Sequence, residues 1–391
     1  MPAPWQSLRV LIYPNSTKAV DPIDLSGPYS TLQFSTGLHG GFKLLRLTVP
    51  MPLGDIWEYL NRHLPGRHFF HIEIVEAHTI VWEGRILDIG FQMSGNRFLL
   101  DLTAAGYVNS LRDQYYDAAD ASNTDWTSGS HSADDVIKEL LTKECPDISS
   151  DQSNIAATTH DIGGLVLTDR AYPLDIITSK IAPLSDTSNQ VWHFAVWENQ
   201  TAYWSPRSLD QVDVIVNLAS LSQLRLTQSA MHLRNAVQPV VGATEGTADD
   251  DDDSLVLYPR RELLLKLPTG VSATVANAAR DTAIAERKQP RQSTSFTVNG
   301  PVYSTEAAPG LPVDGAIAEI PKWRVRAGKV IRIQDLVPQG AATTAFDDLR
   351  TFHIVETNYD AVSDTLRIQP DRPANTLSAI LARLNLLERD Y

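Results

Sequence analysis

The spacing of apolar residues changes period along this chain, and this change constrains the fold more than any other feature of the sequence. In about the first hundred residues, apolar side chains recur at every second position, as in Phe98, Leu100 and Leu102. Successive side chains of a strand point to opposite faces, so this pattern predicts strands with one buried face. We therefore expect a meander in a small barrel or sandwich, with strands at 69–76, 78–89 and 97–103.

The middle of the chain has helical spacing instead. Ser132 followed by Asp135 resembles a capping box, and the apolar residues that follow share one helical face. A second, shorter helix is predicted over 172–181, because a proline stands near its start and another follows its end. A β-hairpin is predicted over 190–206. Residues 112–206 are thus predicted to form a mixed α/β module.

Strand-like spacing returns at 221–242. Five consecutive aspartates follow, from Asp249 to Asp253, and their mutual repulsion favours a solvated loop over a cation site. An Ala-rich helix is expected over 272–287, and the proline-rich stretch 290–321 is expected to be an extended connection. Further strands are predicted at 323–325, 330–336, 352–359 and 365–369, before a final helix that Asn375 can cap.

Composition narrows the possible functions. A chain of 391 residues with 43% apolar and 20% charged residues can form two or three folded domains. Its net charge of −14 argues against sequence-independent binding to nucleic acid. A single cysteine excludes an intrachain disulfide. No apolar run approaches the roughly 20 residues that span a bilayer, and no secretory signal is visible, so we expect a soluble chain that is made in the cytoplasm.

Histidine and glutamate are concentrated in one short region. On a strand, His71 and Glu73 would share a face and could offer two metal ligands. The whole set straddles two turns, however, so polar strand faces and turn residues are the preferred interpretation. This set comprises His63, His68, His71, His78, Glu73 and Glu76.

No catalytic motif is visible in the sequence. Glu83 could pair with Asp88 or Glu73 as the two carboxylates of a glycosidase, but alternation also places it beside Arg85, where an ion pair is the ordinary explanation. The tryptophans Trp192, Trp197 and Trp204 could stack on sugars, although core packing is the default. We therefore predict no catalytic residue, no cofactor and no metal.

Several segments spread over nearly the whole chain match one family pattern. They are 81–86, 105–111, 133–137, 191–197, 233–237, 323–333, 352–360 and 364–366. Together they resemble the tail hub proteins of long-tailed bacteriophages, a family that includes the baseplate hub of contractile tails. None of these segments is a catalytic fingerprint, so the resemblance implies a structural protein and not an enzyme.

The resemblance implies a β-rich α+β fold with two antiparallel β-barrels and two smaller α/β domains. The implied division is a first barrel at 1–111, an α/β domain at 112–206, a second barrel at 207–243 and 320–372, and an inserted domain at 244–319 with a C-terminal helix at 373–391.

The resemblance also implies a homotrimer that adapts the hexameric tail tube to a trimeric fibre or spike around a DNA channel. The implied partners are a distal tail or tail tube ring above, the tape measure protein, a central fibre or spike below, and phage DNA only in transit, with no membrane insertion. The implied location is the tail tip or baseplate of the virion, assembled in the host cytoplasm. The negative net charge of the protein suits such a channel, because like charge repels the phosphates of the DNA that passes through it.

Two other function classes stay open from the sequence. One is a tail-associated carbohydrate-active or peptidoglycan-cleaving enzyme, and the other is a β-rich receptor-binding or sugar-binding module. Because the sequence stops at Tyr391, directly after the expected helix, we expect receptor binding and wall digestion to belong to other chains.

Overall fold

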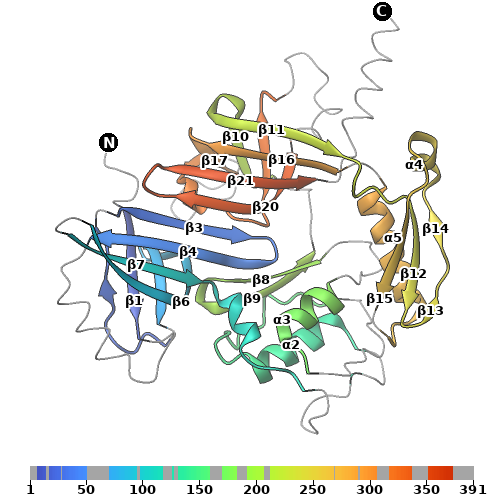
Figure 1. Ribbon diagram of the computed structural model, residues 1–391, viewed down its shortest axis with the longest axis horizontal. Helices are drawn as coiled ribbons and strands as arrows, with labels where there is room; N and C mark the ends of the chain where they lie inside the picture. Colours follow the sequence, from blue (N-terminus) through green and yellow to red (C-terminus); the bar gives the residue numbers. More distant parts are fainter. Residues whose placement is uncertain are drawn as a thin grey trace, which may run out of the picture.

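The computed structural model describes a β-rich α+β fold, which confirms the predicted class (Figure 1). Among the described residues, seventeen strands belong to one large curled sheet and four to a small separate one. In this part of the chain no helix is long and apolar enough to cross a membrane. The described residues are 7–14, 17–27, 29–50, 70–94, 97–117, 126, 131–158, 170–182, 192–206, 212–267, 269–288, 291–305, 317–336 and 351–372.

The N-terminal strands form the first part of the large sheet. Their antiparallel order is β2-β1-β5-β6-β7-β4-β3, so the predicted meander at β5 to β7 is confirmed. Alternate residues of these strands are buried in the main core, as the period of two predicts. The strands are β1 (Leu8–Tyr13), β2 (Ile23–Asp24), β3 (Thr31–Gly37), β4 (Gly40–Pro50), β5 (His71–Glu76), β6 (Thr79–Ser94) and β7 (Arg97–Ala105).

The second part of the large sheet follows the order β11-β16-β21-β20-β19-β10-β17-β18. Strand β20 also pairs with β3, and this pairing joins the two parts into one sheet and one core. The strands are β10 (Val214–Asn217), β11 (Leu221–Ser229), β16 (Arg291–Val298), β17 (Val302–Ser304), β18 (Ala318–Ile320), β19 (Val330–Gln334), β20 (Thr351–Asp360) and β21 (Thr365–Arg372).

Two predictions about this second part were wrong. The stretch 290–321 is not only a connection, because it contains β16, β17 and β18. Strand β16 is rich in serine and threonine, so it lacks apolar alternation, but β11 and β21 satisfy its backbone on both edges. The predicted strand at 323–325 falls on the 3₁₀ turn Lys322–Arg324, which buries Trp323.

The middle of the chain forms a second core below the two parts of the large sheet described above (Figure 1). It contains α2 (Ala133–Glu144), α3 (Pro173–Ile176) with the π-helical turn Ile177–Ile181, and the hairpin of β8 (Trp192–Trp197) and β9 (Thr201–Pro206), which are the remaining two strands of the large sheet. The predicted helices and hairpin are thus confirmed. In the hairpin, Trp192 and Trp204 are buried and stack with their ring centroids 5.4 Å apart, which confirms core packing for these two residues.

The β8–β9 hairpin is attached to the first part of the sheet through a close backbone approach. Gly41 of β4 pairs with Val196 of β8. A Cβ atom on Gly41 would lie 2.1 Å from the Val196 carbonyl oxygen, and the φ angle of Gly41 is +78°. Glycine is the residue that fits both conditions. This contact places the tip of the hairpin, Glu198–Gln200, beside β6.

Helix α2 begins at the serine that the sequence predicts as its cap. The Ser132 hydroxyl accepts the Asp135 backbone N–H at 3.4 Å and donates to the Asp135 carboxylate at 2.7 Å. We expect Ser132→Ala to lower the free energy of unfolding by ~1 kcal/mol, because the amide loses its partner. Ser132→Asn, which can still cap, is the control in urea unfolding. Equal losses in both variants would contradict a capping role.

A small sheet with two helices forms the remaining described part. It consists of β12 (Ala236–Val241), β13 (Thr244–Glu245), β14 (Asp249–Asp250) and β15 (Glu262–Leu267), with α4 (Asp252–Leu257) and α5 (Ala273–Arg287). Helix α5 confirms the predicted Ala-rich helix, and residues of β15 and α5 join the second core. Strand β12 lies in this small sheet and not in the large one.

The aspartate run was wrongly predicted to be only a solvated loop. Asp249 and Asp250 pair with β12, and the Asp251 carboxylate accepts the Ser254 N–H at 2.8 Å as the cap of α4. Lys288 and Arg260 pair with Asp251 and Asp250, so the mutual repulsion is partly neutralised. The predicted final helix, 375–391, lies outside the described residues.

Candidate functional site

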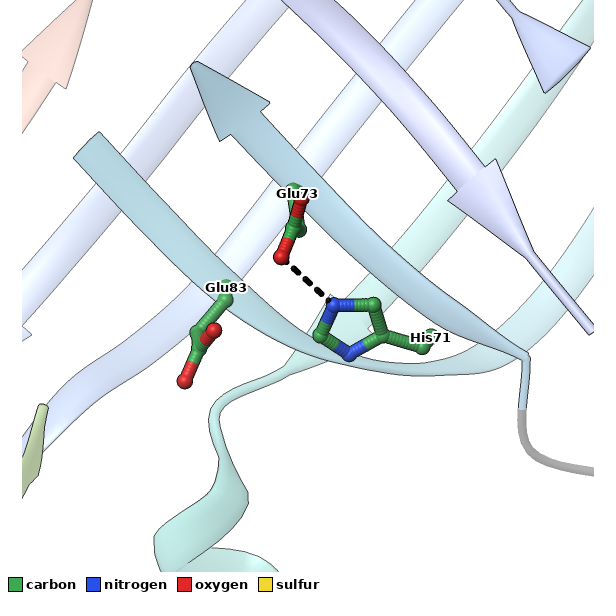
Figure 2. Close-up of side chains that lie close together, drawn as sticks. All are labelled: His71, Glu73 and Glu83. Carbon is green, nitrogen blue, oxygen red and sulfur yellow. Dashed lines mark hydrogen bonds and ion pairs between the residues drawn. The ribbon is translucent and has the colours of Figure 1, made fainter. Parts of the chain in front are cut away.

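The most concentrated set of chemically active side chains is buried on the β5–β6 hairpin. Glu73 of β5 lies directly opposite Glu83 of β6, and His71 lies two residues before Glu73 on the same face (Figure 2). His71 and Glu83 are fully buried and Glu73 is 3% exposed. One ligand atom from each of the three residues lies within 4.8 Å of those of the other two. Two ionised carboxylates directly opposite each other repel, so a bound proton or a nearby cation is needed to offset that repulsion.

Hydrogen bonds fix the His71 ring from both sides. Its Nδ1 shares a hydrogen bond of 2.6 Å with the Tyr107 hydroxyl, and its Nε2 shares one of 2.9 Å with the Glu73 carboxylate. Lys18 forms an ion pair with the same Glu73 oxygen. Tyr107 lies on the 3₁₀ turn that follows β7, and Lys18 lies between β1 and β2. Strand β5 and these two other segments therefore hold the imidazole and its partners in place.

The Glu83 carboxylate is only half satisfied. Its Oε1 accepts the backbone N–H of Gln200, at the tip of the β8–β9 hairpin, at 2.6 Å. Its Oε2 is buried without a hydrogen-bond partner. Burial, and to a smaller extent the charge of Glu73, raises the pKa of Glu83 to about 7. Glu83 therefore keeps its proton to a higher pH than an exposed glutamate does.

Glu73 has the opposite protonation behaviour. Burial alone would raise the pKa of Glu73, but hydrogen bonds from His71 and Lys18, together with their charges, outweigh it and lower the pKa. Burial also keeps the pKa of the Tyr107 hydroxyl well above its usual value. Two facing carboxylates with separated pKa values mark a candidate functional site.

A cavity reaches the cluster from outside. Its volume is about 480 Å³, and Tyr13, Lys18, Glu73 and Asn199 contribute to its lining. The Lys18 side chain, which pairs with Glu73, is 32% exposed, whereas neither His71 nor Glu83 is among the residues that line the cavity. Glu73 is thus the member of the cluster that a small solute reaches first.

The structure brings together some of the sequence candidates and separates others. His71 and Glu73 meet as their spacing predicts, and Glu83 joins them. His78 lies in the turn at the hairpin tip, and Glu76 forms an ion pair with Arg324 at 2.8 Å. His63 and His68 lie outside the described residues.

Glu83 does not form the ion pair that alternation suggested. Arg85 instead contacts Asp113 at 2.5 Å and Asp147 at 3.0 Å. Asp88, the other carboxylate considered, is exposed and lies beyond a β-bulge that interrupts β6. Sequence reasoning missed Lys18 and Tyr107, which carry no motif and reach the cluster only through the fold.

No protein-family model and no curated protein matches the sequence. Solved structures match it along nearly its whole length. A tail protein from Neisseria meningitidis has a TM-score of 0.60 and 10% identity, covering 94% of this chain and 97% of that one. The 43 kDa tail protein of a Shewanella oneidensis prophage has a TM-score of 0.58 and 12% identity, covering 93% and 98%.

A prophage tail protein from Listeria monocytogenes is also similar. It has a TM-score of 0.52 and 10% identity, and the alignment covers 97% of this chain and 99% of that one. All three neighbours are described as tail proteins, and the descriptions of two of them name a prophage. At these identities the likeness establishes the fold, so the chain has the fold of these tail proteins.

Proposed function

We propose that this chain is a non-enzymatic structural protein of a phage tail, and that it forms the trimeric hub of the tail tip or baseplate. The observation that supports this proposal is the full-length likeness of fold, since more than nine tenths of both chains are covered in each of the three comparisons. A likeness of that extent involves the whole arrangement of sheets and helices and not one common module.

The proposed hub uses the two parts of the large sheet as two barrel-like units. In a trimer, two such units per chain would give six similar faces toward a hexameric tube and three true repeats toward a fibre or spike. The proposed division keeps a first barrel near 1–111 and an α/β domain near 112–206. The proposed inserted domain is now the small sheet with α4 and α5. It loses β16 and β17, which pair with strands of the second unit, and it gains β12, which pairs with β13, β14 and β15.

The proposed partners follow from that position. They are a tail tube or distal tail ring above, the tape measure protein, and a central fibre or spike below. The net charge of −14 favours a channel surface that DNA passes without binding.

The oligomeric state tests the hub proposal first. We expect light scattering of the purified chain, over a tenfold range of concentration, to give a mass close to three times the 43.2 kDa of one chain. Negative-stain images of the same sample should show closed rings. A mass of one or two chains over the whole range, without rings after addition of the tube protein, would contradict a trimeric hub.

A further inference from the structure

The two facing carboxylates of the β5–β6 hairpin have no common partner among the described residues. Glu73 is paired with Lys18 and His71, whereas the Oε2 atom of the fully buried Glu83 has none. An unsatisfied buried carboxylate oxygen costs free energy, and native proteins rarely keep one without a reason. A cation between the two strands would satisfy it.

We propose that His71, Glu73 and Glu83 form a binding site for one divalent transition-metal ion, with Zn²⁺ as the representative ion. This inference is independent of the tail function proposed above. Imidazole nitrogen and carboxylate oxygen are ordinary zinc ligands, at ~2.0–2.2 Å from the ion. The nitrogen ligand distinguishes the site from Ca²⁺ and Mg²⁺ sites, which use oxygen ligands.

The geometry fits this donor set. Ligand atoms around a tetrahedral ion lie ~3.3–3.5 Å apart. The His71 Nε2 and the Glu73 carboxylate oxygen are 2.9 Å apart, and all three donors lie within 4.8 Å of one another, so small rotations of the carboxylates would bring them around one ion. Figure 2 shows the two glutamates on neighbouring strands with the His71 ring beside them.

The surroundings supply what a bound ion needs. The second ring nitrogen of His71 is held by the Tyr107 hydroxyl, which is the kind of support that metal-bound imidazoles have. The cavity lined by Glu73 and Lys18 gives the ion a route to the cluster. Lys18 is the competitor, because its ammonium group occupies the Glu73 oxygen that the ion would use.

The consequence of binding would be mechanical. The ion would tie β5 to β6, and Glu83 would tie both to the β8–β9 hairpin through Gln200. It would thus lock the first part of the sheet against the middle of the chain. With three protein ligands in a buried setting, the site has the donors to hold the ion as part of the fold.

The test uses the full chain, freed of metal by a chelator and then dialysed. We expect micromolar Zn²⁺ to raise the melting temperature of the wild type and equilibrium dialysis to find one ion per chain. Glu83→Gln, which keeps the shape of the side chain, should weaken binding at least ~100-fold, since losing even a hydrogen-bond partner of a ligand costs 10–100-fold. His78→Asn, at the tip of the same hairpin, is the control and should bind as the wild type does.

A second variant separates lost binding from lost folding. Lys18→Met leaves all three ligands in place and removes the competing charge, so it should bind Zn²⁺ at least ~10-fold more tightly. A misfolded variant would not gain affinity in this way. Absence of binding in both the wild type and Lys18→Met, or equal binding in the wild type and Glu83→Gln, would overturn the proposal.

Discussion

Phe42→Ala is expected to lower the free energy of unfolding by ~3–5 kcal/mol, the range for removing a large aromatic side chain from a well-packed core. Phe42 of β4 is 1% exposed. Its ring centroid lies 5.1 Å from that of Trp197 in an edge-on arrangement and 6.1 Å from that of Trp82. The residue therefore packs against both the first part of the sheet and the β8–β9 hairpin.

A third part of the chain meets the same ring. The Arg326 guanidinium, from the segment before β19, lies 5.2 Å from the Phe42 ring centroid and 5.4 Å from that of Trp197. Arg326 also forms an ion pair with Glu198 at the tip of the hairpin. Truncation of Phe42 would leave a cavity and remove one face of this cation–π arrangement, so the loss belongs near the upper end of the range.

Guanidinium unfolding of the purified chain measures the effect as a shift of the midpoint. Phe98→Ala is the matched control, because Phe98 is 42% exposed on β7 and the same truncation there leaves no buried cavity. We expect the control to change stability by ~0.5 kcal/mol or less. Similar losses for the two phenylalanines would show that Phe42 does not hold the three parts together.

Much of the fold follows from local sequence patterns. The period of two predicts β5 to β7, a capping serine predicts the start of α2, and the run of alanines predicts α5. These elements have signals that lie within a few residues of one another. Strand β16 has no such signal, because its partners β11 and β21 are far from it in the sequence.

The candidate site was only partly predictable for the same reason. The shared face of His71 and Glu73 follows from strand alternation alone. Glu83 joins them only because the β5–β6 register sets it opposite Glu73, and a β-bulge between Ile74 and Val75 contributes to that register. Lys18 and Tyr107 come from elements that are not adjacent to the hairpin in sequence. The prediction of no metal considered histidines on both sides of the turn and did not combine His71 with Glu83.

The second large effect is a dependence on pH that Glu83→Gln removes. In the folded chain the pKa of Glu83 is about 7, against 4.5 when the group is solvated. The folded state therefore holds the proton that the unfolded state has released, and the free energy of unfolding falls as pH rises from about 4.5 to 7. Lys18 and His71 face Glu73 in the same cluster and are present in both proteins, so a comparison at each pH isolates Glu83.

We expect the stability of Glu83→Gln relative to the wild type to increase by ~2–3 kcal/mol between pH 5 and pH 8, because a pKa difference of one unit is worth ~1.4 kcal/mol. Urea unfolding of both proteins across that range, with a chelator present, measures the difference. Glu262→Gln is the control for the loss of one charge, since the Glu262 side chain is 73% exposed. If the difference between Glu83→Gln and wild type stays constant with pH, Glu83 does not hold its proton in the folded chain, and burial does not raise its pKa as described above.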